Sequence, residues 1–360
     1  MDKASLLQIQ KLLDNSDLLL GTKPKKSYPS YDFSKETILV TGAAGSIGSG
    51  LVQSLVNSKY KKLILLDNAE TPLYYLEKEF SLKQHHSIKF ILGDISDKKA
   101  MKALFETYRP TLIFHAAAYK HVSLMELHPY EAVKVNINAT IYLATLAVQY
   151  NARKFIFIST DKAVNPMGVM GMTKNIAENY LTNLVDTNNT VFITARFGNI
   201  FGSNGSVVPL FIKQLEQGED LSLTDSNISR LFIDKDKACD FILQTSMFET
   251  SENIKVSFDM GKPIKILDLA KLLIDNYNSI HKCNISPGIS ITQLQEGEKL
   301  VEEMISENEV LIPSKTEEIY LILNKKAKTK TLFDLNKLEA VSPFMEAQKI
   351  KVILSTLCQF

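Results

Sequence analysis

The sequence predicts an α/β protein with a doubly wound parallel sheet and a smaller lobe towards the C-terminus. Three observations predict this fold. Short apolar, β-branched runs alternate with helical patterns from Glu36 onwards, a glycine-rich turn joins the first run to the first helix, and polar residues follow directly after several runs. Because repeated βα units build a parallel sheet, these polar residues are expected at its carboxyl edge, where such sheets bind ligands.

The composition excludes several classes of protein. The 360 residues are 45% apolar, enough for a large core, and the formal net charge of +1 gives no basic field that would attract nucleic acid. Cys239, Cys283 and Cys358 lie far apart without metal-ligand spacing, which predicts no metal site and favours a reducing cytosol. No apolar run reaches the roughly 18 residues of a membrane span, and no signal-peptide block is present. We therefore expect a cytoplasmic protein without an integral membrane segment.

The first βα unit carries a dinucleotide-binding pattern. Thr37–Val40 is a short buried strand, Thr41–Gly48 is a glycine turn, and Gly50–Asn57 is a helix. The glycines let backbone N–H groups and the helix N-terminus approach a pyrophosphate, because a Cβ there would collide with it. The next strand, Lys62–Leu66, ends in Asp67, whose carboxylate is placed to hold a ribose 2′-hydroxyl and to repel the 2′-phosphate of NADP. The pattern predicts a Rossmann sheet that binds NAD.

The following units extend the predicted cofactor site. Ile88–Leu92 leads to Asp94, at the adenine end, and Thr111–Phe114 leads to three alanines small enough for the cofactor to lie against. His115 and His121 could be catalytic, but hydrogen-bonded structural histidines are the favoured interpretation. Asn136, within a helix predicted over Pro129–Tyr150, is expected to bind backbone groups. The predicted cofactor-binding residues are Gly42, Gly45, Ser46, Ile47, Gly48, Asp67, Asp94, Ile95, Ala116, Ala117, Ala118 and Lys174.

The stretch Ser159–Lys174 is the candidate catalytic segment. It follows a buried strand, Phe155–Ile158, so Thr160, Asp161 and Lys162 lie at a strand's carboxyl end. Pro166 and Gly168 then break the chain before a helix that runs through Lys174. A solvated loop that caps this helix is the alternative interpretation.

These segments resemble a known family. Its motifs match Thr41–Gly48, His115–Val122, Ser159–Pro166, Lys174, Ala195–Ile200, Gly205–Phe211, Ile228–Phe232 and Gly297–Leu300. The chain resembles the extended short-chain dehydrogenase/reductases, and within them the capsular polysaccharide biosynthesis group of UDP-N-acetylglucosamine 4,6-dehydratases. Two positions depart from the superfamily pattern. Met170 stands where most members have Tyr, and Gln295-Glu296 replaces Arg-Pro, which puts one expected phosphate contact in doubt.

The resemblance implies a lyase that uses NAD. C4 of UDP-N-acetylglucosamine is oxidised, water is eliminated across C5 and C6, and hydride returns to C6. The UDP-4-keto-6-deoxy product, with C5 configuration retained, would serve surface polysaccharide, lipopolysaccharide O-antigen or glycan biosynthesis. Met170 is a feature of one branch, the large membrane-anchored dehydratases, whose soluble catalytic part this chain resembles.

The resemblance also assigns roles to the catalytic segment. Asp161 is the acid for O6, Lys162 is the C5 base, and Thr160 holds or relays the O4 proton, while Lys174 orients the nicotinamide ribose. Met170 occupies a catalytic position but has no proton to exchange. An ionised Asp161 that takes the O4 proton and later delivers it to O6 is an alternative that compensates for Met170.

The substrate half begins near Arg196, itself expected to be a structural ion-pair partner. Predicted substrate-binding residues are Lys120, Asn199, Ser206, Val207, Arg230 and Glu298. Ser206 also fits a turn before a helix over Leu210–Gln217, and Glu298 fits a cap for a helix over Leu300–Ile305. The expected domains are an N-terminal extension of helix plus linker (1–35), an NAD-binding domain (36–195), a mainly substrate-binding lobe (196–330) and a C-terminal helical tail (331–360).

Several alternatives remain open at the level of sequence. The N-terminal helix, marked by Leu6, Leu7, Ile9, Leu12 and Leu13, packs on its own domain or docks on a partner subunit. A homo-oligomer, a dimer or larger, is expected. Rival functions are a sugar-nucleotide 4-epimerase or reductase, which would need a proton-transferring group at Met170, and a non-catalytic NAD-binding sensor or scaffold.

Overall fold

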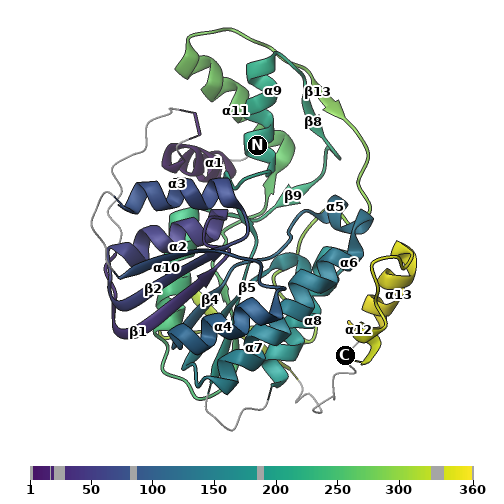
Figure 1. Cartoon of the computed structure of the whole chain (residues 1–360). Coiled ribbons are helices and arrows are strands. Elements are labelled where there is room, and N and C mark those ends of the chain that lie inside the picture. Colours follow the sequence, from purple (N-terminus) through teal and green to yellow (C-terminus); the bar gives the residue numbers. More distant parts are fainter. Residues whose placement is uncertain are drawn as a thin grey trace. The chain divides into compact units, whose positions relative to one another are not determined.

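The computed structural model describes residues 3–16, 18–19, 29–81, 87–184, 190–325 and 336–358. Its central feature is a nine-stranded, mostly parallel sheet with helices on its faces (Figure 1), which confirms the predicted fold class. The strand order is β14-β15-β11-β6-β5-β4-β1-β2-β3. The strands are β1 Asp32–Thr41, β2 Lys59–Asp67, β3 Ile88–Leu92, β4 Leu112–His115, β5 Lys154–Thr160, β6 Val191–Phe197, β11 Ile254–Phe258, β14 Glu309–Pro313 and β15 Ile319–Asn324.

The strand order reverses at β1. From β1 the chain extends the sheet in one direction through β2 and β3, and then crosses over to β4, β5 and β6 on the other side. β1 pairs in parallel with β4, and the last pair in this register joins Thr41 to His115. Such a reversal leaves a crevice at the carboxyl ends of the two strands, where doubly wound sheets bind ligands. The glycine turn and the alanines both begin here.

The helices of this sheet are α2 Ser46–Val56, α3 Glu70–Ser81, α4 Lys98–Tyr108, α5 Val122–Leu127, α6 Pro129–Ala132, α7 Thr140–Gln149, α8 Val169–Asn183 and α10 Lys235–Ser246. α4, α7 and α8 cover one face, because Phe105, Leu143 and Leu181 share a core cluster with Phe155 and Phe157 of β5. α2 and α3 lie on the other face (Figure 1). Burial on both faces explains why the central strands β4, β5 and β6 read as largely apolar runs.

The helix predicted over Pro129–Tyr150 is present but not uniform. α6 and α7 are joined by a π-helical segment, Val133–Ala139, which contains Asn136. A π-helical segment widens the turn by one residue and is often found near functional sites. The apolar periodicity of this stretch therefore predicts its helicity but not the local hydrogen-bond register.

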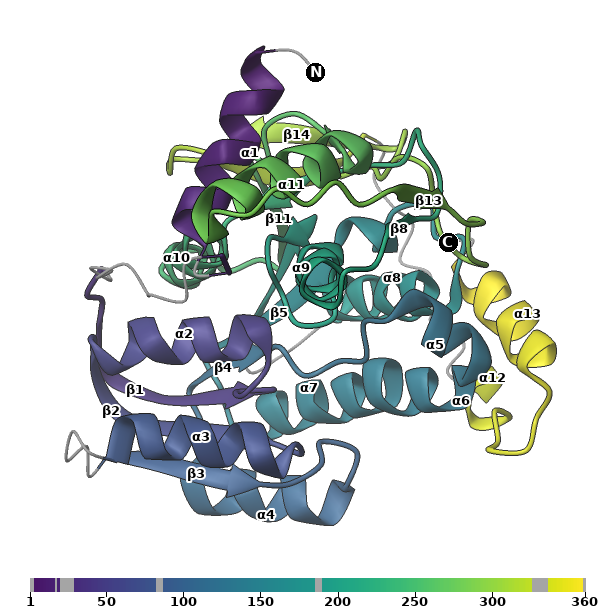
Figure 2. The ribbon, with the colours of Figure 1, turned by 90° about the horizontal axis from the view of Figure 1, so that it is seen from above.

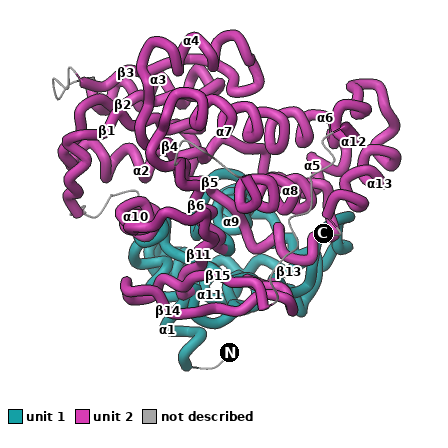
Figure 3. Tube along the Cα trace, turned by 90° about the horizontal axis from the view of Figure 1, so that it is seen from below, with its two compact units in different colours: residues 1–27, 198–238, 260–302 teal, residues 28–197, 239–259, 303–360 magenta. Residues whose placement is uncertain are grey.

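The described chain divides into two compact units, coloured separately in Figure 3. One holds the nine-stranded sheet and comprises residues 28–197, 239–259 and 303–360; the other comprises residues 1–27, 198–238 and 260–302. We call them the sheet unit and the small unit. The small unit contains α1 Lys3–Asn15, β7 Asn199–Ile200, α9 Val207–Gln217, β8 Leu221–Leu223, β9 Ser229–Arg230, β10 Phe232–Ile233, β12 Ile264–Lys265, α11 Ile266–His281 and β13 Ile289–Ile291.

The N-terminal helix α1 packs within the small unit. Ile9, Leu12 and Leu13 are buried and share a cluster with Phe211 of α9 and Leu273 of α11. Of the two expectations for this helix, packing on its own domain is therefore the one observed. Residues 21–28 of the predicted connector lie outside the described residues.

The helix predicted over Leu300–Ile305 is wrong. These residues are irregular because their backbone is held elsewhere: Ser229 N–H donates to the Leu300 carbonyl at 2.9 Å, and the Arg230 guanidinium donates to the carbonyls of Lys299 and Leu300. The helix predicted over Leu210–Gln217 is confirmed as part of α9.

The C-terminal tail is helical in part. Helices α12 Asn336–Glu339 and α13 Ala347–Leu357 agree with the predicted helical tail, but residues 340–346 between them are irregular, and residues 331–335 and 359–360 lie outside the described part. α13 lies beside α6 and α8 (Figure 2). None of the described helices combines the length and apolarity that crossing a bilayer requires.

Candidate active site

The glycine turn after β1 is folded tightly against the chain that follows β4. Gly42 has a φ of +68°, and a Cβ built there would lie 2.6 Å from the Ala117 nitrogen. A Cβ at Gly48 would lie 1.9 Å from the Gly42 carbonyl oxygen. Since real side chains do not approach backbone so closely, both positions require glycine. The turn can therefore bring its backbone right up to a ligand at the switch between β1 and β4.

The turn opens directly into the N-terminus of α2. Gly45 is the N-cap and supplies no side-chain acceptor, and the N–H groups of a helix's first turn have no intrahelical partner. In α2 these groups include the N–H groups of Ile47 and Gly48. A helix start of this kind attracts phosphate through its unpaired donors and its dipole.

Asp67 is fixed at the carboxyl end of β2. One carboxylate oxygen accepts from the Ala44 N–H at 2.8 Å and the other from the Ala69 N–H at 2.9 Å. Each oxygen keeps a second lone pair, so the carboxylate can still accept from a ribose hydroxyl. The glycine turn, the α2 N-terminus and Asp67 together fit the diphosphate and adenosine ribose of NAD, at the positions predicted from the sequence.

The remaining predicted cofactor residues follow the next two strands. Asp94 accepts from the Ser96 N–H at 2.7 Å in a tight turn after β3, and Ile95 beside it is buried. Ala116, Ala117 and Ala118 are partly buried in the segment that follows β4. Their roles towards the cofactor remain predictions.

His115 is a structural residue. Its side chain is 1% exposed, with Nδ1 2.7 Å from the Thr41 hydroxyl and Nε2 2.8 Å from the Thr140 hydroxyl. Burial lowers the pKa of His115 to about 3, with a smaller contribution from the charge of Lys174. The imidazole is therefore neutral and links Thr41 of β1 to Thr140 of α7. This agrees with the interpretation of His115 as a hydrogen-bonded structural histidine.

We expect His115→Gln to make the protein less sensitive to acid. The folded state holds this imidazole neutral down to about pH 3, whereas the unfolded chain binds a proton below about pH 6.5, so stability is lost as pH falls between those values. Glutamine does not titrate, so the variant should lose roughly 1 kcal/mol less per pH unit below pH 6. Urea unfolding at pH 7, 6 and 5 measures this. His128→Gln, at an exposed position, is the control, and equal acid slopes for wild type and His115→Gln would contradict the assignment.

Asn136 also does what was predicted of it. Its amide oxygen accepts from the Tyr119 N–H at 2.9 Å, and its nitrogen donates to the Tyr119 carbonyl at 3.0 Å and to the Thr173 hydroxyl at 3.0 Å. The side chain thus ties the segment after the alanines to α8. His121 and Lys120, in the same segment, are exposed.

Thr160, Asp161 and Lys162 converge at the carboxyl end of β5. The Asp161 side chain is fully buried, and its Oδ1 accepts from the Thr160 hydroxyl at 2.9 Å and from Lys162 Nζ at 3.0 Å. Its Oδ2 is also buried and has no hydrogen-bond partner among the described residues. A buried carboxyl oxygen that lacks a partner is costly. The Asp161 carboxyl therefore keeps one acceptor oxygen while the other is bonded to the Thr160 hydroxyl and the Lys162 amine, an arrangement that suits proton transfer.

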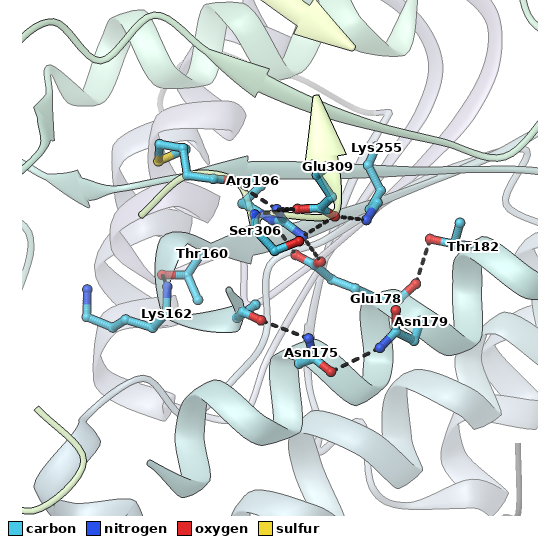
Figure 4. Close-up of polar contacts among 12 residues, drawn as sticks. Thr160, Lys162, Asn175, Glu178, Asn179, Thr182, Arg196, Lys255, Ser306 and Glu309 are labelled. Atoms are coloured by element: carbon cyan, nitrogen blue, oxygen red, sulfur yellow. Dashed lines mark hydrogen bonds and ion pairs between the residues drawn. The ribbon is translucent and has the colours of Figure 1, made fainter. Parts of the chain in front are cut away.

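The turn that carries this pair, Asp161–Ala163, is docked on α8. A Cβ at Gly171 would lie 2.2 Å from the Lys162 carbonyl oxygen, so only glycine lets helix and turn approach this closely. Asn175 Nδ2 donates to the Ala163 carbonyl at 2.8 Å (Figure 4). Sequence reasoning missed both residues. A glycine inside a predicted helix, at position 171, was the available signal, because such a glycine usually has a packing reason.

Lys174 is a buried residue of α8, not a surface lysine. Its Nζ donates to the Ile158 carbonyl at 2.7 Å and lies 4.2 Å from the centroid of the Phe157 ring. Burial lowers the pKa of Lys174 to about 7, against a smaller opposing effect of Glu178. The amine is thus held at the end of β5, the strand that leads to Thr160 and Asp161.

Met170 lies in an apolar cluster. It is 3% exposed and packs among side chains of α5, α6, the π-helical segment and α8, together with Leu338 of α12 and Ile350 and Leu354 of α13. The residue at this position therefore contributes to packing, and a thioether has no proton to exchange.

Arg196 is the structural ion-pair partner that was predicted. Its guanidinium binds Glu178 through two nitrogens and Glu309 at 2.8 Å, and Lys255 binds the same Glu309 (Figure 4). We call Glu178, Arg196, Lys255 and Glu309 the ionic cluster. It lies within the sheet unit and joins α8, β6, β11 and β14. The ionic cluster has no formal net charge, because its two carboxylates balance its two cations.

The predicted substrate residues of the small unit are partly used by the protein itself. Arg230 donates to Glu298 at 3.0 Å and to the Lys299 carbonyl at 2.8 Å. Asn199 donates through its side chain to the Leu231 carbonyl at 3.2 Å. Ser206 is the N-cap of α9, which starts at Val207, and its hydroxyl is buried without a partner among the described residues. The structure brings Arg230 and Glu298 together, and substrate binding by this set remains a prediction.

Within the described ranges, no three His, Cys, Asp or Glu side chains are grouped so that they could hold a metal ion.

Comparison with known proteins identifies the family. The profile of a family described as "Polysaccharide biosynthesis protein" matches residues 38–324, which is most of the sheet unit and the small unit. The chain belongs to the polysaccharide biosynthesis protein family. Among curated members, the capsular polysaccharide biosynthesis protein CapD of Staphylococcus aureus is 39% identical over 84% of this chain, and the probable polysaccharide biosynthesis protein EpsC of Bacillus subtilis is 40% identical over 81%.

This member of the polysaccharide biosynthesis family spans about half the length of those two relatives, 51% of CapD and 49% of EpsC. A relative of similar length is the UDP-N-acetylglucosamine 4,6-dehydratase (inverting) of Campylobacter jejuni, 32% identical, with 81% of this chain matching 83% of that protein.

Solved structures show the same fold. Pen from Bacillus thuringiensis is 27% identical, with a TM-score of 0.71 over 82% of this chain and 89% of that chain. DesIV, a dTDP-glucose 4,6-dehydratase from Streptomyces venezuelae solved with NAD and TYD bound, is 20% identical with a TM-score of 0.63 over 74% and 88%. The chain therefore has the fold of the short-chain dehydrogenase/reductase and epimerase type.

Proposed function

We propose that the chain is an NAD-dependent UDP-N-acetylglucosamine 4,6-dehydratase that forms a UDP-4-keto-6-deoxy sugar for surface polysaccharide. The observation that carries the proposal is the buried Asp161 carboxyl, with one oxygen bonded to Thr160 and Lys162 and the other without a partner. Such a group can take and give a proton next to an amine. The name of the Campylobacter relative supports the substrate and reaction.

The cofactor site fits NAD. The glycine turn and the first turn of α2 would hold the diphosphate, Asp67 the adenosine ribose, and Lys174 the nicotinamide ribose. When bound, NAD supplies the hydride acceptor for C4 and the hydride donor for C6. DesIV, with the same fold, was solved with NAD bound.

Asp161 and Lys162 supply the proton transfers in a closed cycle. An ionised Asp161 takes the O4 proton, relayed by the Thr160 hydroxyl at 2.9 Å. Neutral Lys162 takes the proton from C5, and Asp161 gives its proton to the departing O6, which leaves as water. Lys162 then returns its proton to C5. Each group ends in the protonation state in which it began, and the water contains the O4 proton and the O6 hydroxyl.

Met170 fits this cycle because Asp161 replaces the proton acceptor that tyrosine provides elsewhere in the superfamily. The sequence resemblance to the branch with methionine here supports retention of configuration at C5. The name of the Campylobacter relative states inversion, so the product's stereochemistry separates the two outcomes.

The test is incubation of the purified chain with UDP-N-acetylglucosamine and NAD in D2O. We expect a product lighter than the substrate by one water, apart from the mass of incorporated deuterium, with deuterium at C5 because Lys162 exchanges its proton with solvent. NMR gives the C5 configuration. A product of unchanged mass but inverted C4 would make the protein a 4-epimerase, and bound NAD without any turnover would identify a binding protein or a different sugar nucleotide.

A further inference from the structure

The first turn of α8 is held by a residue outside that helix. α8 begins at Val169, after Gly168, which has no side chain to cap it. The Val169 N–H instead donates to Glu126 Oε1 at 2.6 Å, and the Glu126 side chain, from α5, is 7% exposed. A carboxylate at a helix start accepts the unpaired N–H and interacts favourably with the dipole. Glu126 therefore fixes where α8 begins.

The C-terminal helix holds Glu126 in turn. Lys351 of α13 donates to Glu126 Oε2 at 2.7 Å, and its side chain is 18% exposed. Both oxygens of one carboxylate are thus engaged, one by the start of α8 and one by α13. Because the pair is largely buried, it is screened much less by solvent than a surface pair. α5, α8 and α13 are joined at one carboxyl group.

The same turn of α8 supports the turn Asp161–Ala163. Gly171 lies two residues after Val169 and contacts the Lys162 carbonyl so closely that no Cβ would fit. Met170, between them, shares an apolar cluster with Ile350 and Leu354 of α13. A shift of the helix start would therefore move the backbone against which Lys162 is docked. Misplacement of about 1 Å in an active site can cost on the order of a hundredfold in rate.

We propose that Glu126 is a positioning residue: it sets the start of α8, and through it the place of the Asp161–Lys162 pair, while Lys351 of the C-terminal helix keeps Glu126 in position. The proposal rests on the proposed dehydratase function. Neither Glu126 nor Lys351 touches the reacting atoms. The C-terminal helix thereby acts on the rate of the reaction through a single carboxylate.

The test compares Glu126→Ala, Glu126→Gln and Lys351→Met with wild type. Glu126→Ala removes both contacts, whereas Glu126→Gln keeps an oxygen for the Val169 N–H but loses the charge that pairs with Lys351. We expect kcat to fall about tenfold in Glu126→Ala and roughly threefold in the other two. The KM for the UDP-sugar and the Kd for NAD should stay within about twofold, because the glycine turn and Asp67 are untouched.

Three further measurements exclude a merely structural role. Lys349→Met is the matched control, since Lys349 lies on the same helix and pairs only with the exposed Glu346 in the contacts described; it should leave kcat unchanged. Lys351→Arg should keep the wild-type kcat, because arginine can still form the charge-assisted hydrogen bond to Glu126. Amide hydrogen exchange in the first turn of α8 should rise in Glu126→Ala and Lys351→Met and not in Lys349→Met.

The outcomes separate this inference from the proposed function. An inactive wild-type enzyme overturns the dehydratase and the inference with it. An active wild type with unchanged kcat in Glu126→Ala overturns the inference alone. If Glu126→Ala lowers the melting temperature but leaves kcat of the folded fraction unchanged, Glu126 contributes to stability and does not position the pair. Equal losses of kcat in Lys349→Met and Lys351→Met would reject the specific contact between Lys351 and Glu126.

Discussion

Asp161→Asn should lower kcat for dehydration by about a thousandfold or more while leaving the Kd for NAD within about twofold. Asparagine has the same shape and keeps an acceptor for Thr160, but its amide can neither take the O4 proton nor give one to O6. One lost proton transfer costs roughly a hundredfold to ten-thousandfold, and Asp161 carries two in the proposed cycle. Steady-state rates, with NAD affinity from a binding titration, measure the effect.

The matched control is Asp97→Asn. Asp97 is an exposed N-cap whose carboxylate accepts from the Ala100 N–H at 3.0 Å. Since asparagine caps a helix about as well as aspartate, the rate should not change. An Asp161→Asn enzyme that retained a tenth of the wild-type rate would show that this carboxyl is not the proton carrier.

Lys162→Ala separates the roles of the pair. It should also abolish formation of the dehydrated product, and the sugar nucleotide recovered from D2O should carry no deuterium at C5, since no amine remains to exchange that proton. If Lys162→Ala still labels C5, another group is the base. Lys174, whose pKa is about 7 at the end of the same strand, would be the next residue to replace.

Local patterns explain how much of the fold could be predicted. The central strands β4, β5 and β6 are buried along almost their whole length, so each reads as a largely apolar run, and Gly42 and Gly48 mark a turn where backbone must approach backbone. The helix–strand alternation then leaves few possible topologies. These features depend on neighbours in sequence, which is why they are visible without a structure.

The errors arose where distant residues decide the conformation. Leu300–Ile305 has a helical pattern, but Arg230 and Ser229, some seventy residues earlier, bind the carbonyls of Lys299 and Leu300 at its start. β14 and β15 join the sheet in antiparallel fashion and are held through Glu309 by Arg196. The π-helical segment around Asn136 likewise depends on contacts with Tyr119 and Thr173. No window of local sequence contains these partners.

The site shows the same division. The residue types at Thr160, Asp161 and Lys162 and their place after a strand were predictable. That Asp161 would be fully buried with one unpaired oxygen was not, since burial depends on what packs above the strand. Glu126 carried no signal at all: a glutamate on a short helix is ordinary, and its importance comes from Val169 and Lys351.

Arg196→Met should cost about 3 to 5 kcal/mol of unfolding free energy, the largest stability loss we expect from a single substitution. Arg196 is 2% exposed and touches Glu178 and Glu309. Without it, one cation, Lys255, faces two buried carboxylates, and the Met304 carbonyl also loses its donor. The cost is that of an uncompensated buried charge, not the net value of the ion pair.

The chain offers a matched surface pair. Arg153 binds Glu36 at 2.8 Å, the same distance as Arg196 to Glu309, but the Arg153 side chain is 48% exposed. Arg153→Met should therefore cost less than about 1 kcal/mol. Urea unfolding of both variants gives the comparison, and equal costs would mean that burial does not govern the ionic cluster.

The double variant Arg196→Met with Glu178→Gln tests the reasoning further. Removing one carboxylate restores the balance of one cation and one anion, so the double variant should be more stable than the sum of the single losses predicts.

The acid dependence of unfolding gives a second test of the ionic cluster. Arg196 and Lys255 lower the pKa of Glu309 to about 2, so its contribution is complete above about pH 4.5 and is lost as pH falls towards 2. In Arg196→Met that pKa rises, and the loss should begin at higher pH. An unchanged acid midpoint would show that Lys255 alone holds Glu309 ionised.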